Sequence, residues 1–516
     1  MMLQSKLRSG NYDALLAAIA GFILIQLLCG FGGIGVSPDS VVYLSTAQNI
    51  HDHALINDFT NQPVMDFPAF YPIVLSGVLF LTGDASALSF GPVLDGLLFG
   101  LLIWLCGWMM DRFSVAIRWY KWPILLFIVL SPCLLEIYTM IWSETLFLLL
   151  SVLFMIACHR YFRTHSIGSL VLIGVIAGLS CVTRYAGVAV VAMGGLLMLC
   201  DGRLRWGWRK TGHMALYGVL SLSFLALNLY RNYMLTRTLT GYREKGLTPF
   251  LTNLHDFGSV FCDWLPFFNE RYGAAVFVAL VFLVLITGIF VRRLVRRTGF
   301  FSYDTIAISL FVVYGGFILY TATVSRFQQL DSRLLSPLFL PWLWGSTIWI
   351  PGVLRRAASM WKTLGAGLTA AAAACFLWGE IKAWRENWEG IHYAGIPGYT
   401  ETQWLKSQTL AYVREHKERF QRPGTVYSNA SEGLWFLAGG MKSDLMPHRD
   451  FPEDIAYLYR SKYFVVIWFN DADNSDLITI DDIKANKHLV EELDFNDGAI
   501  YFFKDSVEPP APAPSH

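Results

Sequence analysis

The chain has 516 residues, of which 54% are hydrophobic and only 15% are charged, and its mean hydropathy is +0.44. No soluble single domain is this apolar, so the composition excludes a purely soluble protein and indicates a polytopic α-helical membrane protein. A formal net charge of +1 gives no indication of a nucleic-acid partner. The sequence also lacks a G-x-x-x-x-G-K-S/T phosphate-binding loop, which argues against an ATP-driven pump.

Apolar segments recur along the first 380 residues, and each is long enough to cross a hydrocarbon core of about 30 Å. If the N-terminus is cytoplasmic, the inner loops hold more than twice as many Lys and Arg as the outer loops. This bias fits the positive-inside rule and places the C-terminal region outside the membrane. The predicted spans, about eleven in number, are centred near Leu24, Gly100, Ile128, Leu150, Ile176, Met193, Leu222, Phe282, Phe311, Leu343 and Ala371.

The first outer loop, residues 37–90, contains several aspartates but no Lys or Arg. In its opening sequence, Ser37 suits the N-cap of a helix and Pro38 suits the first helical turn. This arrangement sets the Asp39 carboxylate at the positive end of a helix, close to the membrane surface. There Asp39 either takes a proton from an acceptor hydroxyl as a general base or merely complements the helix dipole.

Two other polar groups in outer loops are candidates for function. Glu144 lies in the short turn between the third and fourth spans, where it either belongs to a site or caps the following helix. His51, Asp52 and His53 form a cluster for which a solvated loop is favoured over a metal site, because the spacing shows no convergent set of ligands.

Three arginines, Arg184, Arg326 and Arg333, lie at the outer ends of apolar segments. A guanidinium at that depth can hold a phosphate in a bidentate fork, which a phosphate-bearing lipid substrate requires. Each arginine alone could equally reach lipid headgroups or pair with an acid such as Asp331. Three at the same face favour an anion site. A further group of basic residues either adds to this site or forms an ordinary solvated loop face, which is favoured: Arg231, Arg237, Arg243 and Lys245.

The chain changes character near residue 380 and becomes polar with an excess of acidic residues. Strand-like runs alternate with helix-like stretches such as 402–417, which predicts a small α/β domain over 381–505 on the outer face. Residues 1–380 then form the membrane domain, and the proline-rich end over 506–516 is a disordered tail. The strand-like runs cover 425–427, 463–469 and 499–503.

Several short motifs occur in a fixed order along the membrane part, over about residues 12–350. In this order they resemble the GT-C membrane glycosyltransferases, of the protein O-mannosyltransferase and aminoarabinose-transferase type (glycosyltransferase family 39 type). The motifs are Asp39 after the first span, a first-loop motif with Tyr43, Pro68, Tyr71 and Pro72, Ser143-Glu144-Thr145, Thr183-Arg184-Tyr185-Ala186-Gly187 and Arg333-Leu334-Leu335-Ser336-Pro337.

The resemblance implies a GT-C-like fold in the inner (cytoplasmic) membrane. It implies a sugar donor on polyprenyl phosphate and an inverting transfer, on the outer face, to a lipid, glycan or protein acceptor. Asp39 is then the general base and Glu144 a second catalytic acid, while Arg184, Arg326 and Arg333 bind the lipid phosphate. Many relatives have an acidic pair where this chain has Asp39 followed by Ser40. We therefore predict no metal ligand, although a divalent metal is left open.

Two other classes of function compete with this interpretation. A lipid-linked glycan transporter or flippase also needs arginines near a lipid phosphate, but it should show two similar halves and polar residues spread through many spans. This sequence instead concentrates its polar groups on one face and has an asymmetric, long first loop. A scaffolding protein that merely anchors its C-terminal domain would not need eleven spans or acids at membrane depth.

Overall fold

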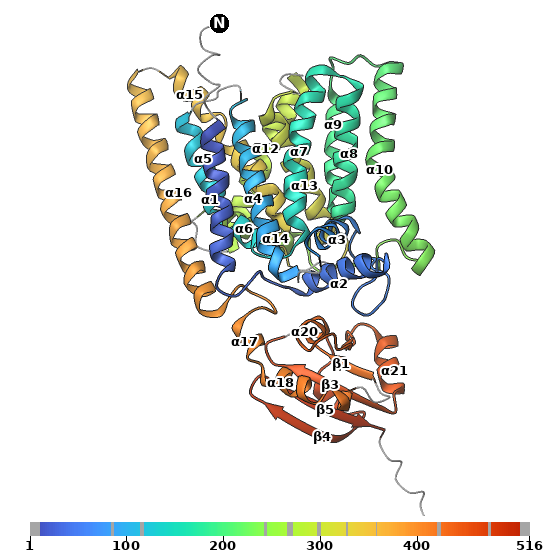
Figure 1. Cartoon of the computed structure of the whole chain (residues 1–516). Coiled ribbons are helices and arrows are strands. Elements are labelled where there is room, and N and C mark those ends of the chain that lie inside the picture. Colours follow the sequence, from blue (N-terminus) through green and yellow to red (C-terminus); the bar gives the residue numbers. More distant parts are fainter. Residues whose placement is uncertain are drawn as a thin grey trace, which may run out of the picture.

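The computed structural model has a helical bundle joined to a small sheet domain (Figure 1). The predicted tail over 506–516 and Arg243 lie outside the residues that the structure describes. The described residues are 11–83, 87–113, 118–241, 245–265, 272–296, 301–326, 329–357, 359–420, 425–472 and 476–505.

Within the described residues, seven helices are long and apolar enough to cross a membrane: α1 (Asn11–Cys29), α4 (Ala87–Met110), α7 (Ser143–Thr164), α10 (Trp208–Thr236), α12 (Tyr272–Arg296), α13 (Tyr303–Val324) and α16 (Ser359–Ala394). Helices α5 (Arg118–Leu130) and α6 (Pro132–Tyr138) meet at a bend of 49° and together form an eighth candidate. The bend falls at Pro132, because proline lacks the N–H that a continuous helix needs.

Shorter helices complete the bundle, namely α8 (Ile167–Thr183), the 3-10 turn η1 (Tyr185–Gly187), α9 (Val188–Cys200), α11 (Phe250–Trp264), α14 (Ser332–Thr347) and α15 (Ile350–Arg356). Every predicted span centre falls within one of the helices named so far. The helical multi-pass fold is therefore confirmed, while the number of spans and their orientation stay predictions.

The first loop forms two helices, α2 (Pro38–His53) and α3 (Phe70–Thr82), at the end of the bundle that faces the sheet domain (Figure 1). The predicted start of α2 is confirmed. The hydroxyl of Ser37 accepts a hydrogen bond from the amide of Ser40, and the Ser40 hydroxyl accepts one from the amide of Ser37. This capping box fixes the first turn of α2, which carries Asp39.

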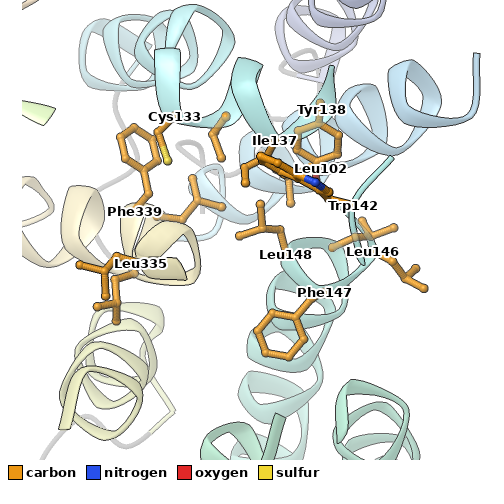
Figure 2. Packing of buried hydrophobic residues seen from close by; sticks show 14 of the residues in the cluster. Leu102, Cys133, Ile137, Tyr138, Trp142, Leu146, Phe147, Leu148, Leu335 and Phe339 are labelled. Carbon is orange, nitrogen blue, oxygen red and sulfur yellow. The ribbon is translucent and has the colours of Figure 1, made fainter. Parts of the chain in front are cut away.

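The most buried helix of the bundle is α7, whose first residues belong to the candidate site described below. Figure 2 shows side chains from α6, α7 and α14 packed against one another. Phe147 and Leu335 are fully buried there, as are Ile137 and Tyr138. Apolarity alone does not place α7 centrally, because α12 is more apolar and yet mostly not buried within the bundle, so the central position of α7 follows from how the helices pack.

The C-terminal part contains a five-stranded sheet in the order β2-β1-β3-β5-β4. Strand β1 pairs in parallel with β2 and β3, whereas β5 pairs antiparallel with β3 and β4. Helices cover both faces, which confirms the small α/β domain. The strands are β1 (Thr425–Ser428), β2 (Asp444–Leu445), β3 (Tyr463–Phe469), β4 (His488–Phe495) and β5 (Gly498–Lys504), and the helices are α17 (Thr402–Leu405), α18 (Gln408–Glu415), α19 (Lys417–Phe420), α20 (Ser431–Leu437), α21 (Pro452–Arg460) and α22 (Ile480–Lys484).

Two details of this region differ from the sequence-based expectation. The helix expected over 402–417 is divided into α17, α18 and the start of α19, because Ser407 caps a new helix by accepting a hydrogen bond from the Leu410 amide. Helix α16 also continues from the membrane part to Ala394, across the boundary expected near residue 380. The sheet domain is thus connected to the bundle by a long helix and the short segment that follows it (Figure 1).

Candidate active site

Four charged side chains predicted as site residues meet at the end of the bundle that faces the sheet domain. Arg333 Nη2 lies 2.5 Å from Asp39 Oδ2, and Arg333 Nε lies 2.6 Å from Glu144 Oε1. The same Glu144 oxygen lies 2.6 Å from Arg184 Nη1. The four groups therefore form one continuous chain of ion pairs in the order Asp39, Arg333, Glu144 and Arg184.

Each of these residues is placed by the end of a helix. Asp39 and Glu144 are the second residues of α2 and α7, where the positive end of the helix dipole favours an acid. Arg333 is the second residue of α14, where a cation is disfavoured. Asp331 caps α14 by accepting from the Leu334 amide at 2.8 Å, while Arg333 turns to the two other acids. Arg333 lies at the positive end of the α14 dipole, where it does not cap the helix. Its position there favours a role in a site.

The two acids differ in their access to a substrate. The Glu144 side chain is 1% exposed, whereas the Asp39 side chain is 30% exposed. Burial of a carboxylate is costly unless cations and hydrogen bonds satisfy it, and Glu144 has two guanidinium partners. The geometry thus lets Asp39 contact a bound molecule, while Glu144 holds the two arginines in place.

A second set of contacts fixes the orientation of these charges. The indole N–H of Trp142 donates to Ser37 Oγ at 2.8 Å, and the guanidinium of Arg333 lies 4.0 Å from the centre of the Trp142 ring. Ser143 Oγ accepts a hydrogen bond from Arg184 at 3.1 Å and lies 3.2 Å from the hydroxyl of Tyr43. The start of α7 therefore connects both arginines to α2.

The backbone that leads into α2 is held on both sides. On one side, the Gly35 amide donates to the Thr139 carbonyl at 2.8 Å. On the other side, the Tyr399 amide donates to the Val36 carbonyl at 2.7 Å. Gly398 makes this approach with a φ of +110°, and a Cβ there would lie 2.4 Å from the Val36 oxygen. The segment after α16 thus clamps the chain just before Asp39, and only glycine fits at this close contact.

Asp39, Arg184 and Arg333 line a cavity of about 530 Å³, which we call the arginine cavity. Of the first-loop motif, Tyr43 and Pro68 line the cavity. Tyr71 packs behind them, with its ring centre 5.1 Å from that of Tyr43, and Pro72 is buried in the first turn of α3. The cavity is lined by Asp39, Tyr43, Asp66, Phe67, Pro68, Ser143, Thr183, Arg184, Tyr185, Ala186, Thr240, Phe317, Ile318, Thr321, Ser325, Arg326, Arg333 and Leu334.

Arg326 lies at the same cavity, but its guanidinium contacts the sheet domain. It is 2.8 Å from Asp450 and 2.9 Å from Asp476. Arg231, by contrast, does not line the cavity, and it donates to the carbonyls of Val64 at 2.9 Å and Ile56 at 2.7 Å. This contact attaches the first loop to α10, which is a structural role that the sequence did not suggest.

The described residues do not fit a divalent metal site. Asp39 and Glu144 both face the guanidinium of Arg333, which occupies the space between the carboxylates. His51 pairs with the adjacent Asp52 at 2.7 Å on the far end of α2. No group of three or more His, Cys, Asp or Glu side chains converges within the described ranges. We therefore derive no chemical step that involves a metal.

Two acids near the site were not singled out as candidates from the sequence. Asp66 lines the arginine cavity from the first loop. Glu432, on α20 of the sheet domain, lies close enough to Asp39 and Asp58 to interact with their charges: its pKa is raised by burial first and then by these two carboxylates. No local pattern could have found Glu432, because its position depends on how the sheet domain docks on α2.

The sequence matches no known protein family and no curated protein. Its fold, however, matches solved structures. The crystal structure of ArnT from Cupriavidus metallidurans bound to undecaprenyl phosphate has a TM-score of 0.56 at 11% sequence identity, and the match covers 94% of this chain and 97% of that chain. The archaeal oligosaccharyltransferase AglB from Archaeoglobus fulgidus, in complex with an inhibitory peptide and a dolichol-phosphate, has a TM-score of 0.47 at 14% identity, covering 88% and 69%.

The match to ArnT defines the fold of the protein. This match extends over nearly the whole of both chains. The chain is a multi-pass membrane protein with the GT-C fold, as its motifs predict. At 11% identity the match concerns the fold, and the chemistry has to be argued from the side chains.

Proposed function

We propose that the protein is an inverting glycosyltransferase that moves a sugar from a polyprenyl-phosphate donor to an acceptor at the outer face of the cytoplasmic membrane. The observation that carries this proposal is the position of Arg333, which joins the partly exposed Asp39 to the buried Glu144 at the wall of a cavity. The fold is shared with ArnT, whose crystal structure holds undecaprenyl phosphate. Transfer from a lipid phosphate needs a base that takes the proton of the acceptor and a cation that stabilises the leaving phosphate.

In the proposed reaction, an acceptor hydroxyl attacks the anomeric carbon of the donor sugar. Asp39 takes the proton of that hydroxyl, and the new bond forms on the side opposite the phosphate. The bond between the anomeric carbon and the phosphate oxygen breaks, and its electron pair stays on that oxygen. Polyprenyl phosphate therefore leaves with one more negative charge, and a single displacement inverts the sugar.

The ion-pair chain suggests how the leaving charge is stabilised. Before the reaction, Arg333 is shared between Asp39 and Glu144. When Asp39 becomes protonated, its attraction for Arg333 weakens at the moment when the phosphate gains charge. The guanidinium of Arg333 is then available to the phosphate, together with that of Arg184. Glu144, which stays buried, keeps both arginines in position throughout.

The proposal is tested by transfer of a labelled sugar from polyprenyl phosphate by the purified protein in detergent micelles. We expect one member of a panel of polyprenyl-phosphate sugars to lose its label to acceptors in a membrane lipid extract. A transporter has no measurable activity without a sealed bilayer, so transfer in micelles separates the two classes. If no donor of this kind loses its sugar in the presence of folded protein, the proposed function is wrong.

A further inference from the structure

A second cavity, of about 770 Å³, lies between α6, α14, α16 and the segment that follows α16. We call it the acidic cavity, because Glu136, Asp263, Glu380, Glu386 and Glu401 line it. No Lys, Arg or His is among the described residues of its wall. The arginine cavity has three arginines, so the two cavities differ in the charge of the ligand that they favour.

Glu380 is the most informative residue of this wall. It is only 5% exposed, and its Oε2 atom has no hydrogen-bond partner among the described residues. One turn further along α16, the indole N–H of Trp384, which lines the same cavity, is also without a partner there. Residues four apart lie on one face of a helix, so both unsatisfied groups face this cavity. A buried carboxylate oxygen without a partner costs stability, and a cation bound in this cavity would satisfy it.

The remaining walls indicate what kind of molecule fits. Glu136 lines the cavity from α6 and is exposed toward it. Trp264 and Phe339 add aromatic surface, and Leu28 adds aliphatic surface. Carboxylates beside aromatic rings attract a positively charged amine, through ion pairs and through the faces of the rings. The apolar surface suits a hydrocarbon chain attached to that amine.

We propose that the acidic cavity binds a positively charged amphipathic molecule, an amine carried on an apolar chain, and that this molecule is the acceptor of the sugar. The second half of this inference rests on the proposed function. Ser37 and Pro38 line the acidic cavity, whereas Asp39 lines the arginine cavity. The start of α2 thus stands between the two cavities, and a hydroxyl of the bound molecule reaches Asp39 from one side while the donor lies on the other.

The amine serves recognition rather than attack. An ammonium group paired with a carboxylate has no free electron pair, so it is not a nucleophile. The attacking group is a hydroxyl of the same molecule, whose proton goes to Asp39 as described above. The positive charge of the ammonium group determines which acceptor binds, and the chemical reaction is still the single displacement described above.

Binding is tested by photolabelling of the full-length protein in a neutral detergent. The probe is a long-chain primary amine that carries a diazirine, and the matched probe is the alcohol with the same chain. Mass spectrometry of the peptides that contain α6 and α16 then measures labelling. We expect the amine to label this wall of the wild-type protein and Glu380→Gln to reduce that labelling by about 10-fold or more, as the loss of a charge-assisted contact does.

Two further variants keep this test decisive. Glu136→Gln, on the other wall, should also lower labelling, and it changes a side chain that is exposed to the cavity. Glu389→Gln is the control, because Glu389 lies on α16, pairs with Arg385 on the outside and does not line the cavity. Equal labelling of the wild type and Glu380→Gln, or equal labelling by the alcohol, overturns the proposed cation site.

The acceptor role has its own readout. With an active donor in hand, long-chain amines that carry a hydroxyl should accept the sugar, whereas matched neutral molecules should not. If the amine labels the cavity and the enzyme glycosylates only neutral or acidic acceptors, the acceptor role is wrong and the proposed function stands. If the amine labels the cavity and no donor is ever consumed, the proposed function fails while the cation site stands.

Discussion

The guanidinium of Arg333 lies 2.5 Å from the carboxylate of Asp39, a residue almost three hundred positions earlier in the chain. The same guanidinium contacts Glu144, so one cation serves an exposed acid and a buried acid at once. Substitutions at these positions should therefore not be additive, because removal of either acid changes what Arg333 can bind.

Arg333→Ala should weaken binding of the polyprenyl-phosphate donor by about 10-fold to 150-fold, since a charge-assisted contact to phosphate is worth roughly 1.5 to 3 kcal/mol. Arg333→Lys should restore only part of this, because a point charge replaces a planar fork. Donor titrations at saturating acceptor measure the effect. Arg385→Ala, on the exposed side of α16, is the control. Unchanged donor affinity in Arg333→Ala would place the phosphate elsewhere.

Glu144→Gln should reduce both stability and donor affinity, while its maximal rate falls less than that of Asp39→Asn. The buried carboxylate holds Arg184 and Arg333, and removal of one partner from a buried ion pair typically costs about 3 to 5 kcal/mol. Thermal unfolding in detergent and separate values of kcat and KM test this. A variant with wild-type stability and KM but a rate as low as that of Asp39→Asn would show that Glu144 takes part in the chemistry itself.

Arg326→Ala should release the sheet domain from the bundle more than it weakens donor binding. Its guanidinium is already engaged by Asp450 and Asp476, so we expect faster amide exchange around these two aspartates. The double variant Asp450→Asn/Asp476→Asn should reproduce this effect while it leaves the arginine in the cavity. If Arg326→Ala weakens the donor as strongly as Arg333→Ala and the double variant does not, Arg326 binds phosphate, as the sequence suggested.

Glu432→Gln should stabilise the protein at neutral pH. Burial and the carboxylates of Asp39 and Asp58 raise the pKa of Glu432 in the folded state. A raised pKa in the folded state means that this group's contribution to stability is present at low pH and is lost as the pH rises through that pKa. As the pH rises through the pKa of Glu432, the unfolding temperature should therefore fall less steeply in the variant than in the wild type. Identical pH profiles would show that the pKa of Glu432 is not raised in the folded protein.

The sequence predicted correctly those secondary-structure elements that are specified by neighbouring residues in the chain. Ser37 and Pro38 specify the start of α2 through capping, and the continuous apolar run of 463–469 specifies β3, so the first residue of α2 and both ends of β3 were predicted correctly. Strand β4 was missed, because its alternating buried and exposed positions give a weaker signal than a continuous apolar run.

The site itself was predictable only as a set of candidates. Resemblance and membrane position selected Asp39, Glu144, Arg184 and Arg333, but no spacing could show that they form one chain of ion pairs. The same limit applied to Arg326, whose partners Asp450 and Asp476 belong to the sheet domain. Contacts between residues far apart in sequence depend on how the helices pack and dock, which a single sequence does not display.

The most direct test of the account is the rate of sugar transfer from polyprenyl phosphate by Asp39→Asn, measured in micelles beside the wild type and Asp52→Asn. Asp52 lies at the other end of α2 and pairs with His51, so its substitution controls for changes to the helix. We predict that Asp39→Asn folds normally and loses about 100-fold to 10,000-fold in rate, as expected for a general base, while Asp52→Asn stays close to the wild type. Near-normal turnover by a folded Asp39→Asn protein would contradict the account.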